Sequence, residues 1–273
     1  MEGNQLERGK ETLLAVEHLQ KSYVTKSGTT DVIHDLDFSL VPGEFVCIVG
    51  PSGAGKTTLL RSIAGLLPPT SGTLQFEGRE ITSPPDDMAV VFQEYGRSLF
   101  PWMTVRKNIE FPLIEKGLPK DERTRLVDEA LAAVGLANSA KMYPWQLSGG
   151  MQQRVAIARA VAYEPTLLLM DEPFAAVDAQ TRADLEDLVR ELWHRLGVTV
   201  LFVTHDIEES IYLAQRVLVL SDRPTEILAD LHIDLPEPRD QLSTRMLPEF
   251  GNYRAQVYDL VQQAKRGLRR SGV

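Results

Sequence analysis

The feature that most constrains this fold is an apolar run that leads directly into a glycine-rich loop. The run occupies residues 45–49 and is expected of a strand that is buried on both faces of a sheet. The loop, Gly50-Pro-Ser-Gly-Ala-Gly-Lys56-Thr57, fits the pattern G-x-x-x-x-G-K-[ST], and residues 56–66 after it have helical spacing. A strand, a loop and a helix in this order predict an α/β fold with a site for the phosphates of a nucleotide.

Further strands and helices alternate along the chain, which favours a parallel sheet with helices on both faces. Strands are expected at residues 13–16, 38–40, 45–49, 73–76, 167–170 and 198–203. Helices are expected at residues 56–66, 121–136, 151–163 and 180–196, with a polar helix at 252–270. Because residues 95–160 contain no convincing strand, we interpret them as a helical subdomain inserted in the sheet.

The composition argues against several classes of protein. The chain has 38 acidic and 29 basic residues, and its net charge of −9 disfavours broad binding to nucleic acid or attachment to a membrane through a basic surface. The single cysteine, Cys47, excludes an internal disulfide and suits a reducing compartment. The polar start, residues 1–11, lacks the apolar core of a signal peptide, and no stretch approaches the roughly 18–20 apolar residues that cross a bilayer. A role at a membrane would therefore require protein partners.

The glycine-rich loop has the residues that bind a nucleotide's phosphates. Glycines let the backbone N–H groups wrap the β-phosphate, while Lys56 would reach the β- and γ-phosphates and the Thr57 hydroxyl would ligate Mg²⁺. The alternative is a glycine-rich turn with a surface lysine, and the strand before the loop and the helix after it weigh against that reading. The predicted nucleotide-binding residues here are Gly50, Pro51, Ser52, Gly53, Ala54, Gly55, Lys56, Thr57 and Thr58.

Two carboxylates follow the apolar strand at residues 167–170. Asp171 is placed to hold Mg²⁺ through water, and Glu172 could polarise the attacking water as a general base. Alone, an Asp-Glu pair after a strand is more often a solvated turn, and a lone histidine after a strand, such as His205, is more often structural. Their combination with the phosphate loop favours the functional reading, in which His205 senses the γ-phosphate.

A second anion site is predicted at the segment Leu147-Ser148-Gly149-Gly150-Met-Gln152-Gln-Arg154. Ser-Gly-Gly before a strong helix offers free N–H groups, a hydroxyl and the positive end of the helix dipole. A simple capped helix start would use the same residues, so both readings stay open from the residues alone. Because a second lysine loop is missing from the sequence, we interpret the site as one that completes the nucleotide site of another subunit.

Taken together, these motifs make the chain resemble the nucleotide-binding subunits of ABC transporters over residues 12–235. The resemblance implies an α/β fold of the P-loop NTPase class, with a RecA-like mixed sheet, an antiparallel β subdomain and an inserted helical signature subdomain at about residues 95–160. A short C-terminal extension follows at residues 236–273. The D-loop segment reads Ala175-Ala-Val-Asp178 where family members commonly have Ser-Ala-Leu-Asp, a change that keeps the small residues and the acid.

The same resemblance assigns roles to single residues. It implies that Tyr23 stacks on adenine and that Asp178 is the D-loop aspartate beside the nucleotide. It implies ATP and Mg²⁺ as cofactors, with catalytic residues Glu172, His205, Lys56 and Gln93. It implies metal ligands Thr57, Gln93 and Asp171, and nucleotide contacts from Ser148, Gly149 and Gly150 of a second copy.

A finer resemblance concerns the residues after Gln93. The aromatic stretch at residues 95–105 and the segment at residues 231–240 resemble the nitrate/sulfonate/taurine import branch, so we expect an importer of small oxyanions or organosulfur compounds. Phe100 and Trp102 would form a socket for a helix of the membrane subunit, although local core packing explains either residue equally well.

The expected partners follow from this family resemblance. They are a second cassette in a homodimer, transmembrane permease subunits and, indirectly, a solute-binding protein, with no nucleic acid. The expected location is the cytoplasmic face of the inner membrane, as a peripheral protein. The alternatives are another transported substrate or an exporter, and, less favoured, a soluble ABC ATPase without a transport role. That last class carries a long coiled-coil insertion or two cassettes in one chain, which this sequence lacks.

Overall fold

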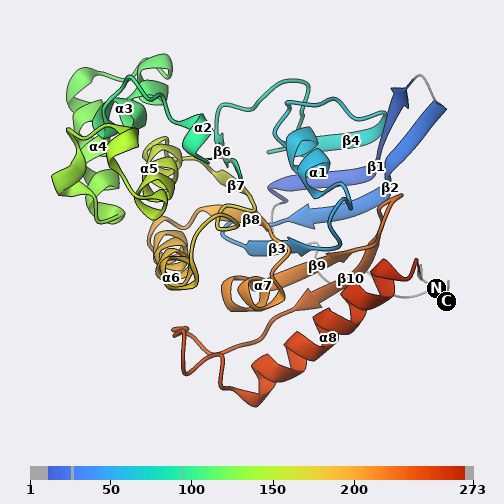
Figure 1. The fold of residues 1–273 in the computed structure, drawn as a ribbon. Coiled ribbons are helices and arrows are strands. Elements are labelled where there is room, and N and C mark those ends of the chain that lie inside the picture. The colour runs from blue at the N-terminus through green and yellow to red at the C-terminus, as the bar shows by residue number, and fades with distance from the viewer. Residues whose placement is uncertain (1–11, 26–27, 94, 268–273) are drawn as a thin grey trace. The chain divides into compact units, whose positions relative to one another are not determined.

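The computed structural model describes residues 12–25, 28–93 and 95–267 (Figure 1). The chain forms two compact units, each described here by itself. The first unit combines the described residues up to Pro85 with those from Gly197 onward, and the second unit spans Asp86–Leu196. The polar start at residues 1–11 lies outside the described residues.

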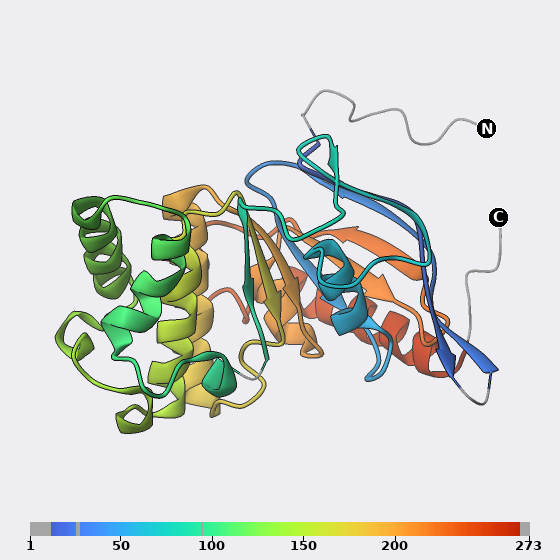
Figure 2. The ribbon, with the colours of Figure 1, turned by 90° about the horizontal axis from the view of Figure 1, so that it is seen from above.

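The first unit contains an antiparallel sheet with the strand order β2-β1-β4-β5. Its strands are β1 (Leu14–Thr25), β2 (Gly28–Leu40), β4 (Ser71–Phe76) and β5 (Arg79–Glu80). The two long strands β1 and β2 run side by side, as the blue ribbons of Figure 2 show, with Val16 opposite Phe38. Apolar residues on one face of the hairpin are buried, whereas the outer end of β2 is exposed and polar.

A second, mainly parallel set of strands in this unit has the order β10-β9-β3-β8. Its strands are β3 (Phe45–Val49), β8 (Thr199–Val203), β9 (Arg216–Leu220) and β10 (Ile227–His232). Every residue of β3 is buried, because this strand pairs in parallel with β8 on one side and β9 on the other. The helices of the unit are α1 (Lys56–Ile63), α7 (Ile207–Leu213) and α8 (Pro248–Lys265). Helix α8 packs along β9 and β10 (Figure 1).

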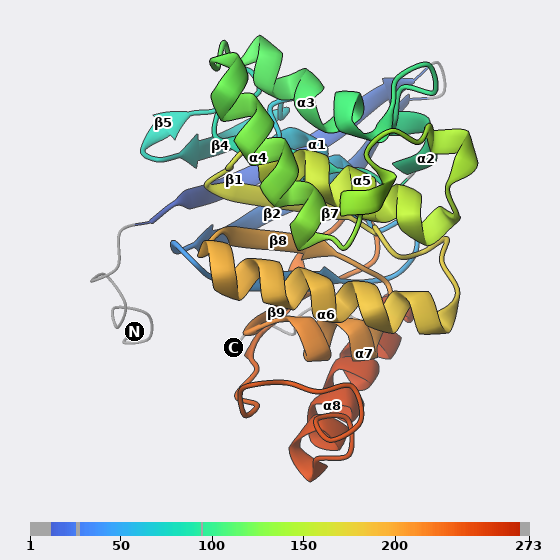
Figure 3. The same cartoon turned by 90° about the vertical axis from the view of Figure 1, so that its left-hand side faces the viewer.

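The second unit is mostly helical and contains one parallel pair of strands, β6 and β7. Its elements are β6 (Met88–Val91), α2 (Tyr95–Ser98), α3 (Val105–Glu115), α4 (Lys120–Ala133), 3₁₀ turns at Ala137–Ser139 and Pro144–Gln146, α5 (Gly149–Ala162), β7 (Leu167–Asp171) and α6 (Ala179–Leu196). Helices α3, α4 and α5 pack against one another (Figure 3), and α5 also packs on β6 and α6. This central place explains why α5 buries a run of small and branched apolar residues, Val155–Ala158.

Several predicted elements need correction. Strands β1 and β2 run far beyond the expected residues 13–16 and 38–40, because hydrogen bonds between them continue into a polar, exposed hairpin where burial gives no sequence signal. The C-terminal helix starts at Pro248 rather than at residue 252, and it buries Phe250, Val257 and Val261 instead of being polar throughout. Its predicted last residues, 268–270, lie outside the described residues. Helix α3 was not predicted, because Pro112 inside it is a residue that normally ends helices.

Within the part of the chain that the structure describes, no helix combines the length and the apolar character needed to cross a membrane.

Candidate functional site

The glycine-rich loop joins the buried strand β3 to helix α1, as its pattern predicts. Gly53 and Gly55 adopt φ values of 85° and 80°, in the left-handed region that favours glycine. A Cβ atom at Gly55 would also lie 2.8 Å from Cγ1 of Val32, so this position excludes a side chain on two grounds. The loop therefore turns tightly and brings its backbone N–H groups to the start of α1, the arrangement that binds anions.

Lys56, the first residue of α1, turns its side chain back into the loop. Its ammonium group donates hydrogen bonds to the carbonyl oxygens of Gly50 at 3.0 Å and Pro51 at 3.1 Å. The side chain is buried, at 5% exposure. A buried cation inside a ring of backbone groups can hold the charge of a phosphate far better than a surface lysine can, which disfavours the reading as a simple turn.

Two residues that the sequence analysis missed fix the loop from outside. The Arg223 guanidinium donates to the carbonyl oxygen of Gly53, and the Thr225 hydroxyl donates to the carbonyl oxygen of Ala54. Both bonds hold carbonyls of the loop on the side of β9–β10, because Arg223 and Thr225 lie in the connection between these strands. Neither residue belongs to a motif, and each lies about 170 positions from its partner, so only the fold could identify them.

His205 follows strand β8, which pairs in parallel with β3. The backbone N–H of Thr204 donates to the carbonyl oxygen of Ile48 at 3.0 Å, which extends the strand pair up to the phosphate loop. Since the carboxyl ends of parallel strands meet at one edge of a sheet, the loop and the exposed His205 belong to the same edge. The structure thus brings together the phosphate loop and the predicted sensor.

In the second unit, Gln93 and Glu172 follow the neighbouring parallel strands β6 and β7. Nε2 of Gln93 donates a hydrogen bond to Oε2 of Glu172 at 3.5 Å, so the two predicted catalytic residues are in contact. Asp171, the last residue of β7, is 3% exposed. Glu172, the next residue, is only partly buried. Adjacent carboxylates in different environments can serve different roles, one as a metal ligand and one as a base.

The backbone of Glu172 adopts an unusual conformation. Its φ is 42°, in the left-handed region that residues other than glycine rarely occupy and that costs about 1–3 kcal/mol. Strain of this kind persists where the surrounding structure enforces it and is frequent at active sites. It turns the Glu172 side chain away from the direction that a continuing strand would give it.

The Ser148-Gly149-Gly150 segment begins helix α5, as expected. The Ser148 hydroxyl accepts from the backbone N–H of Met151 at 3.3 Å and caps the helix, while Ser148 and Gly149 are exposed. The capped-start reading is thus correct, and it is compatible with an anion site because the exposed helix N-terminus retains its positive dipole end.

Gly150 has a specific neighbour, Thr181 at the start of α6. A Cβ atom on Gly150 would lie 2.4 Å from Cγ2 of Thr181. Thr181 is held in turn by Asp178, whose carboxylate accepts from the Thr181 hydroxyl at 2.7 Å and from its backbone N–H at 3.0 Å. These hydrogen bonds hold the pKa of Asp178 below its ordinary value. The structure therefore joins the predicted D-loop aspartate to the Ser-Gly-Gly segment through Thr181, a residue that no motif indicated.

Tyr23, the predicted adenine contact, lies on β1 and is 39% exposed, with the Lys21 ammonium 5.4 Å from its ring centroid. An exposed ring on a strand is open to stacking, and its role stays a prediction.

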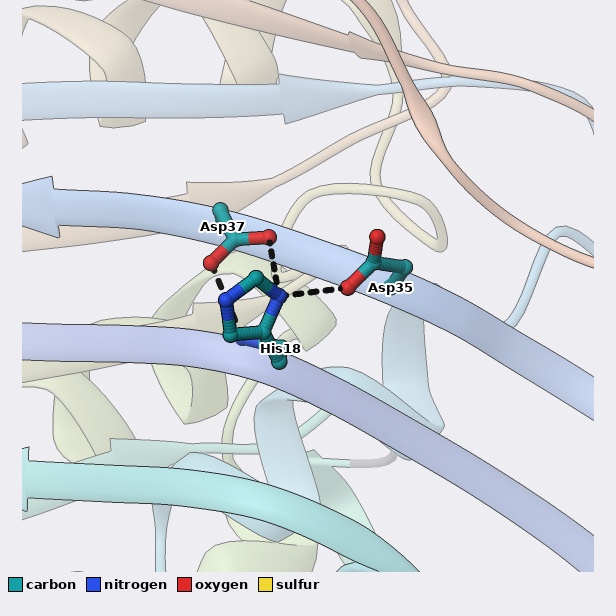
Figure 4. A group of neighbouring side chains, drawn as sticks. All are labelled: His18, Asp35 and Asp37. Atoms are coloured by element: carbon teal, nitrogen blue, oxygen red, sulfur yellow. Dashed lines mark hydrogen bonds and ion pairs between the residues drawn. The ribbon is translucent and has the colours of Figure 1, made fainter.

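A further cluster of polar side chains lies on the same hairpin (Figure 4). Nδ1 of His18 lies 2.8 Å from Oδ1 of Asp35 and 3.4 Å from Oδ2 of Asp37, and the backbone N–H of His18 donates to the other oxygen of Asp37. The hydrogen bond to Asp35 and the charge of Asp37 raise the pKa of His18. His and carboxylate side chains at this spacing could hold a cation. Because all three are exposed and bond to one another, we assign them to the pairing of β1 with β2.

The predicted residues thus fall into two groups, one in each unit. The phosphate loop, Tyr23 and His205 belong to the first unit, and Gln93, Asp171, Glu172, Asp178 and the Ser-Gly-Gly segment belong to the second.

Comparison with known proteins adds independent information. The family model described as ABC transporter matches residues 33–175. The nitrate import ATP-binding protein NrtD of Synechocystis sp. is 45% identical over 254 residues, which cover 91% of this chain and 95% of the relative. The bicarbonate transport ATP-binding protein CmpC of Synechococcus elongatus is 42% identical, over 93% of this chain and 38% of the relative.

Two solved structures are similar as well. One is a dimeric post-hydrolysis state of the ATP-binding cassette MJ0796 bound to ADP and Pi, with a TM-score of 0.71 and 32% identity over 81% of this chain and 99% of the other. The other is cbiO1 from Clostridium perfringens, part of the ABC transporter complex cbiONQ, with a TM-score of 0.73 and 29% identity over 82% of this chain and 89% of the other.

Proposed function

The chain belongs to the ABC transporter family as one of its ATP-binding, ATP-hydrolysing subunits, and from this premise we propose that it energises an importer of small oxyanions or organosulfur compounds. The observation that carries the proposal is the phosphate loop with its buried Lys56, in a chain that is 45% identical to a nitrate import ATP-binding protein. A relative named for bicarbonate transport supports the same class of substrate, a small oxyanion. The sulfonate and taurine variants of the proposal rest on the resemblance of residues 95–105 and 231–240 alone.

The chemistry that we propose assigns one role in ATP hydrolysis to each predicted residue. Lys56 and the loop N–H groups would bind the β- and γ-phosphates of ATP, Glu172 would take the proton of the attacking water, and His205 would contact the γ-phosphate. The contact between Gln93 and Glu172 supports this role for Glu172, because a polar neighbour can orient the carboxylate.

Mg²⁺ is proposed as the metal that accompanies ATP. Its proposed ligands are the hydroxyl of Thr57, the amide oxygen of Gln93 and the buried carboxylate of Asp171, and oxygen donors of this kind fit a hard cation. When bound, the ion would neutralise charge on the phosphates.

We propose a homodimer in which Ser148, Gly149 and Gly150 of one copy complete the ATP site of the other. The exposed, capped start of α5 supports this, because its dipole end is open to an anion from a second chain. The similarity to the dimeric MJ0796 cassette supports it too. ATP that binds both chains would favour the closed dimer, and hydrolysis would release it.

The proposed membrane partner would dock on an apolar groove of the second unit. The groove has a volume of about 400 Å³ and is lined by Phe100, Phe111, Pro112 and Tyr163 among others. The Trp102 ring lies 5.5 Å from that of Phe100, and the residue is 70% exposed, so packing against Phe100 covers only part of its surface. A helix of a permease subunit would fit such a socket, which would hold the chain at the cytoplasmic face of the inner membrane, with a solute-binding protein acting indirectly through the permease.

The test is copurification from detergent-solubilised membranes, followed by an ATPase assay with and without the recovered partners. The proposal expects a membrane protein to be recovered and turnover to rise when a solute-binding protein is loaded with nitrate, bicarbonate, a sulfonate or taurine. A Trp102→Ala variant, which removes the ring beside the lining residue Phe100, should lose the membrane partner. Trp145→Ala, at a similarly exposed tryptophan whose ring stacks on Tyr143 instead, should retain it. Recovery of only nucleic acid or non-membrane partners, with ATPase activity retained, would refute the transport proposal and leave the ATPase.

A further inference from the structure

Helix α7 begins two residues after His205, and both of its ends contact a segment that lies beyond the expected end of the cassette at residue 235. We call this segment, residues 237–254, the C-terminal strap. It contains the connection after β10 and the start of α8. Its first residues belong to the segment 231–240 that resembles the import branch, and the sequence gives none of its side chains a role in ATP hydrolysis.

At the C-terminal end of α7, the strap supplies Arg239. Nη1 of Arg239 donates hydrogen bonds to the carbonyl oxygens of Ile211 at 2.9 Å, Tyr212 at 2.8 Å and Ala214 at 2.9 Å. The Arg239 side chain is only 1% exposed, and its Nε lies 3.2 Å from Oε1 of Glu237. The last carbonyls of a helix lack partners within the helix, and a cation stabilises that end, so Arg239 fixes where α7 stops.

At the N-terminal end of α7, the strap supplies two more arginines. The Glu208 carboxylate, in the first turn of the helix, accepts from Nη1 of Arg245 at 3.1 Å and from Nη1 of Arg254 at 3.0 Å. The Arg245 guanidinium also lies 5.0 Å from the ring centroid of Tyr212 and 5.9 Å from that of Phe250. Stacking of this kind orients the guanidinium, so the geometry of the ion pair between Arg245 and Glu208 is fixed.

The two residues that flank His205 in the chain, Thr204 and Asp206, hold its backbone between strand β3 and helix α7. On one side, the backbone N–H of Thr204 bonds to the carbonyl oxygen of Ile48 at 3.0 Å. On the other side, the carboxylate of Asp206 accepts from the backbone N–H of Glu208 at 3.0 Å and caps α7. His205 therefore lies between a fixed strand end and the first turn of α7, and a shift of α7 would move it.

We propose that the C-terminal strap positions α7 and, through it, His205 for ATP hydrolysis. Arg239, Arg245 and Arg254 are then positioning residues that act through the helix. The inference rests on the proposed role of His205. The plain alternative is that the same contacts only anchor α8, in which case losing them lowers stability without a specific effect on turnover.

The experiment is a double-mutant cycle in the full chain, with its membrane partners, between His205→Ala and the pair Arg245→Ala/Arg254→Ala. A misplacement of 1 Å far from the chemistry can cost on the order of 10²-fold in rate, so we expect the arginine pair to lower kcat by roughly threefold to tenfold. The KM for ATP should stay nearly unchanged. In the His205→Ala background the same pair should lower kcat no further, because its target is gone. Replacing Arg245→Ala by Arg245→Lys in the arginine pair variant retains the charge, so kcat should recover part of the way toward the wild-type value.

A matched control variant tests whether the loss of kcat is specific to the strap arginines, and an NMR signal reports on His205 directly. Arg125→Ala removes an exposed arginine paired with Glu129 on α4 and should leave kcat unchanged. If turnover in His205→Ala is too low to measure a further loss, the imidazole NMR signal of His205 should shift in the arginine pair variant, while that of His194 should not.

The outcomes separate the two proposals. A loss of kcat that persists in full in the His205→Ala background, or an unchanged kcat and His205 signal with a lowered melting temperature, would overturn the strap proposal alone. Normal turnover in His205→Ala itself would instead remove His205 from the proposed mechanism, and the strap proposal with it.

Discussion

Replacing Gly150 by alanine tests why a glycine occupies the first turn of α5. Either the backbone requires it, or the neighbouring Thr181 side chain leaves no room for a Cβ atom. Gly150 lies in the first turn of α5, and its φ is not in the left-handed region. On backbone grounds alone alanine would be favoured here by up to about 1 kcal/mol, since glycine is a poor helix former. The Cγ2 atom of Thr181 opposes this, because it would lie 2.4 Å from the new Cβ.

The magnitude follows from the overlap. Carbon atoms in contact prefer about 3.5–4.0 Å, so the new Cβ would be roughly 1 Å too close. Thr181 cannot swing away freely, because its hydroxyl and its backbone N–H both bond to Asp178. Overpacking in such a place costs about 1–3 kcal/mol, which exceeds the helix gain. We expect a net loss of about 1–2 kcal/mol and a melting temperature lowered by roughly 2–8 °C.

The assay is thermal unfolding of four chains: wild type, Gly150→Ala, Thr181→Ser and the double variant. Thr181→Ser removes Cγ2 but keeps the hydroxyl for Asp178, and the remaining atoms, Cβ and Oγ1, lie 3.7 and 3.8 Å from the new Cβ, an ordinary separation. In the serine background, Gly150→Ala should therefore be neutral or stabilising. Gly251→Ala is the control, because this glycine lies inside α8 with open space around its Cβ position, so alanine there should stabilise. If Gly150→Ala raises the melting temperature of the wild-type chain, the steric reasoning is wrong.

Three further predictions concern the nucleotide site and the β1–β2 hairpin. Glu172→Gln should lower the rate of ATP hydrolysis on the order of a hundredfold or more, while ATP binding and an ATP-bound dimer persist. Turnover and size-exclusion measurements with ATP would check this, and near-normal turnover would remove the general-base role. Lys56→Ala should weaken equilibrium ATP binding measured by titration calorimetry, and unchanged affinity would contradict the role of the phosphate loop. Because the pKa of His18 is raised in the folded chain, its pairing with Asp35 and Asp37 stabilises the fold below the ordinary pKa of 6.5, and this contribution is lost as the pH rises through the raised value. The melting-temperature difference between wild type and His18→Asn should thus be larger near pH 5.5 than near pH 9, and a pH-independent difference would contradict the ion pair.

The sequence predicted well those elements whose residues are buried in a regular pattern. Strand β3 has the expected bounds of 45–49, because all five side chains are apolar and buried. Helix α6 begins one residue before the expected start and ends at the expected Leu196. The hairpin of β1 and β2 escaped prediction because its outer part is held by backbone pairing between exposed residues, which leaves no apolar alternation to detect.

For the candidate site, the sequence identified the residues whose chemistry faces the nucleotide in the proposed mechanism. It did not identify the residues that hold them. Arg223 and Thr225 bond to carbonyls of the phosphate loop, and Thr181 borders Gly150, yet each acts through one bond or one contact across the fold. An arginine or a threonine in a connection has no local pattern that distinguishes it from an ordinary surface residue. The left-handed backbone of Glu172 is equally invisible, because a glutamate normally avoids that region.

The difference between the residues that the sequence identifies and the residues that hold them has a physical cause. A phosphate loop can be recognised from eight consecutive residues because the anion binds to backbone groups of one turn, and the turn dictates its own glycines. His205 has no such local definition: its position depends on Ile48 through Thr204 and on α7 through Asp206, and α7 depends on arginines more than 30 residues further along the chain. In the proposed mechanism His205 contacts the γ-phosphate, so its position would depend on the three arginines that hold the two ends of α7. The parts of the site that the sequence could not predict are therefore those held by contacts between segments that are distant in the chain.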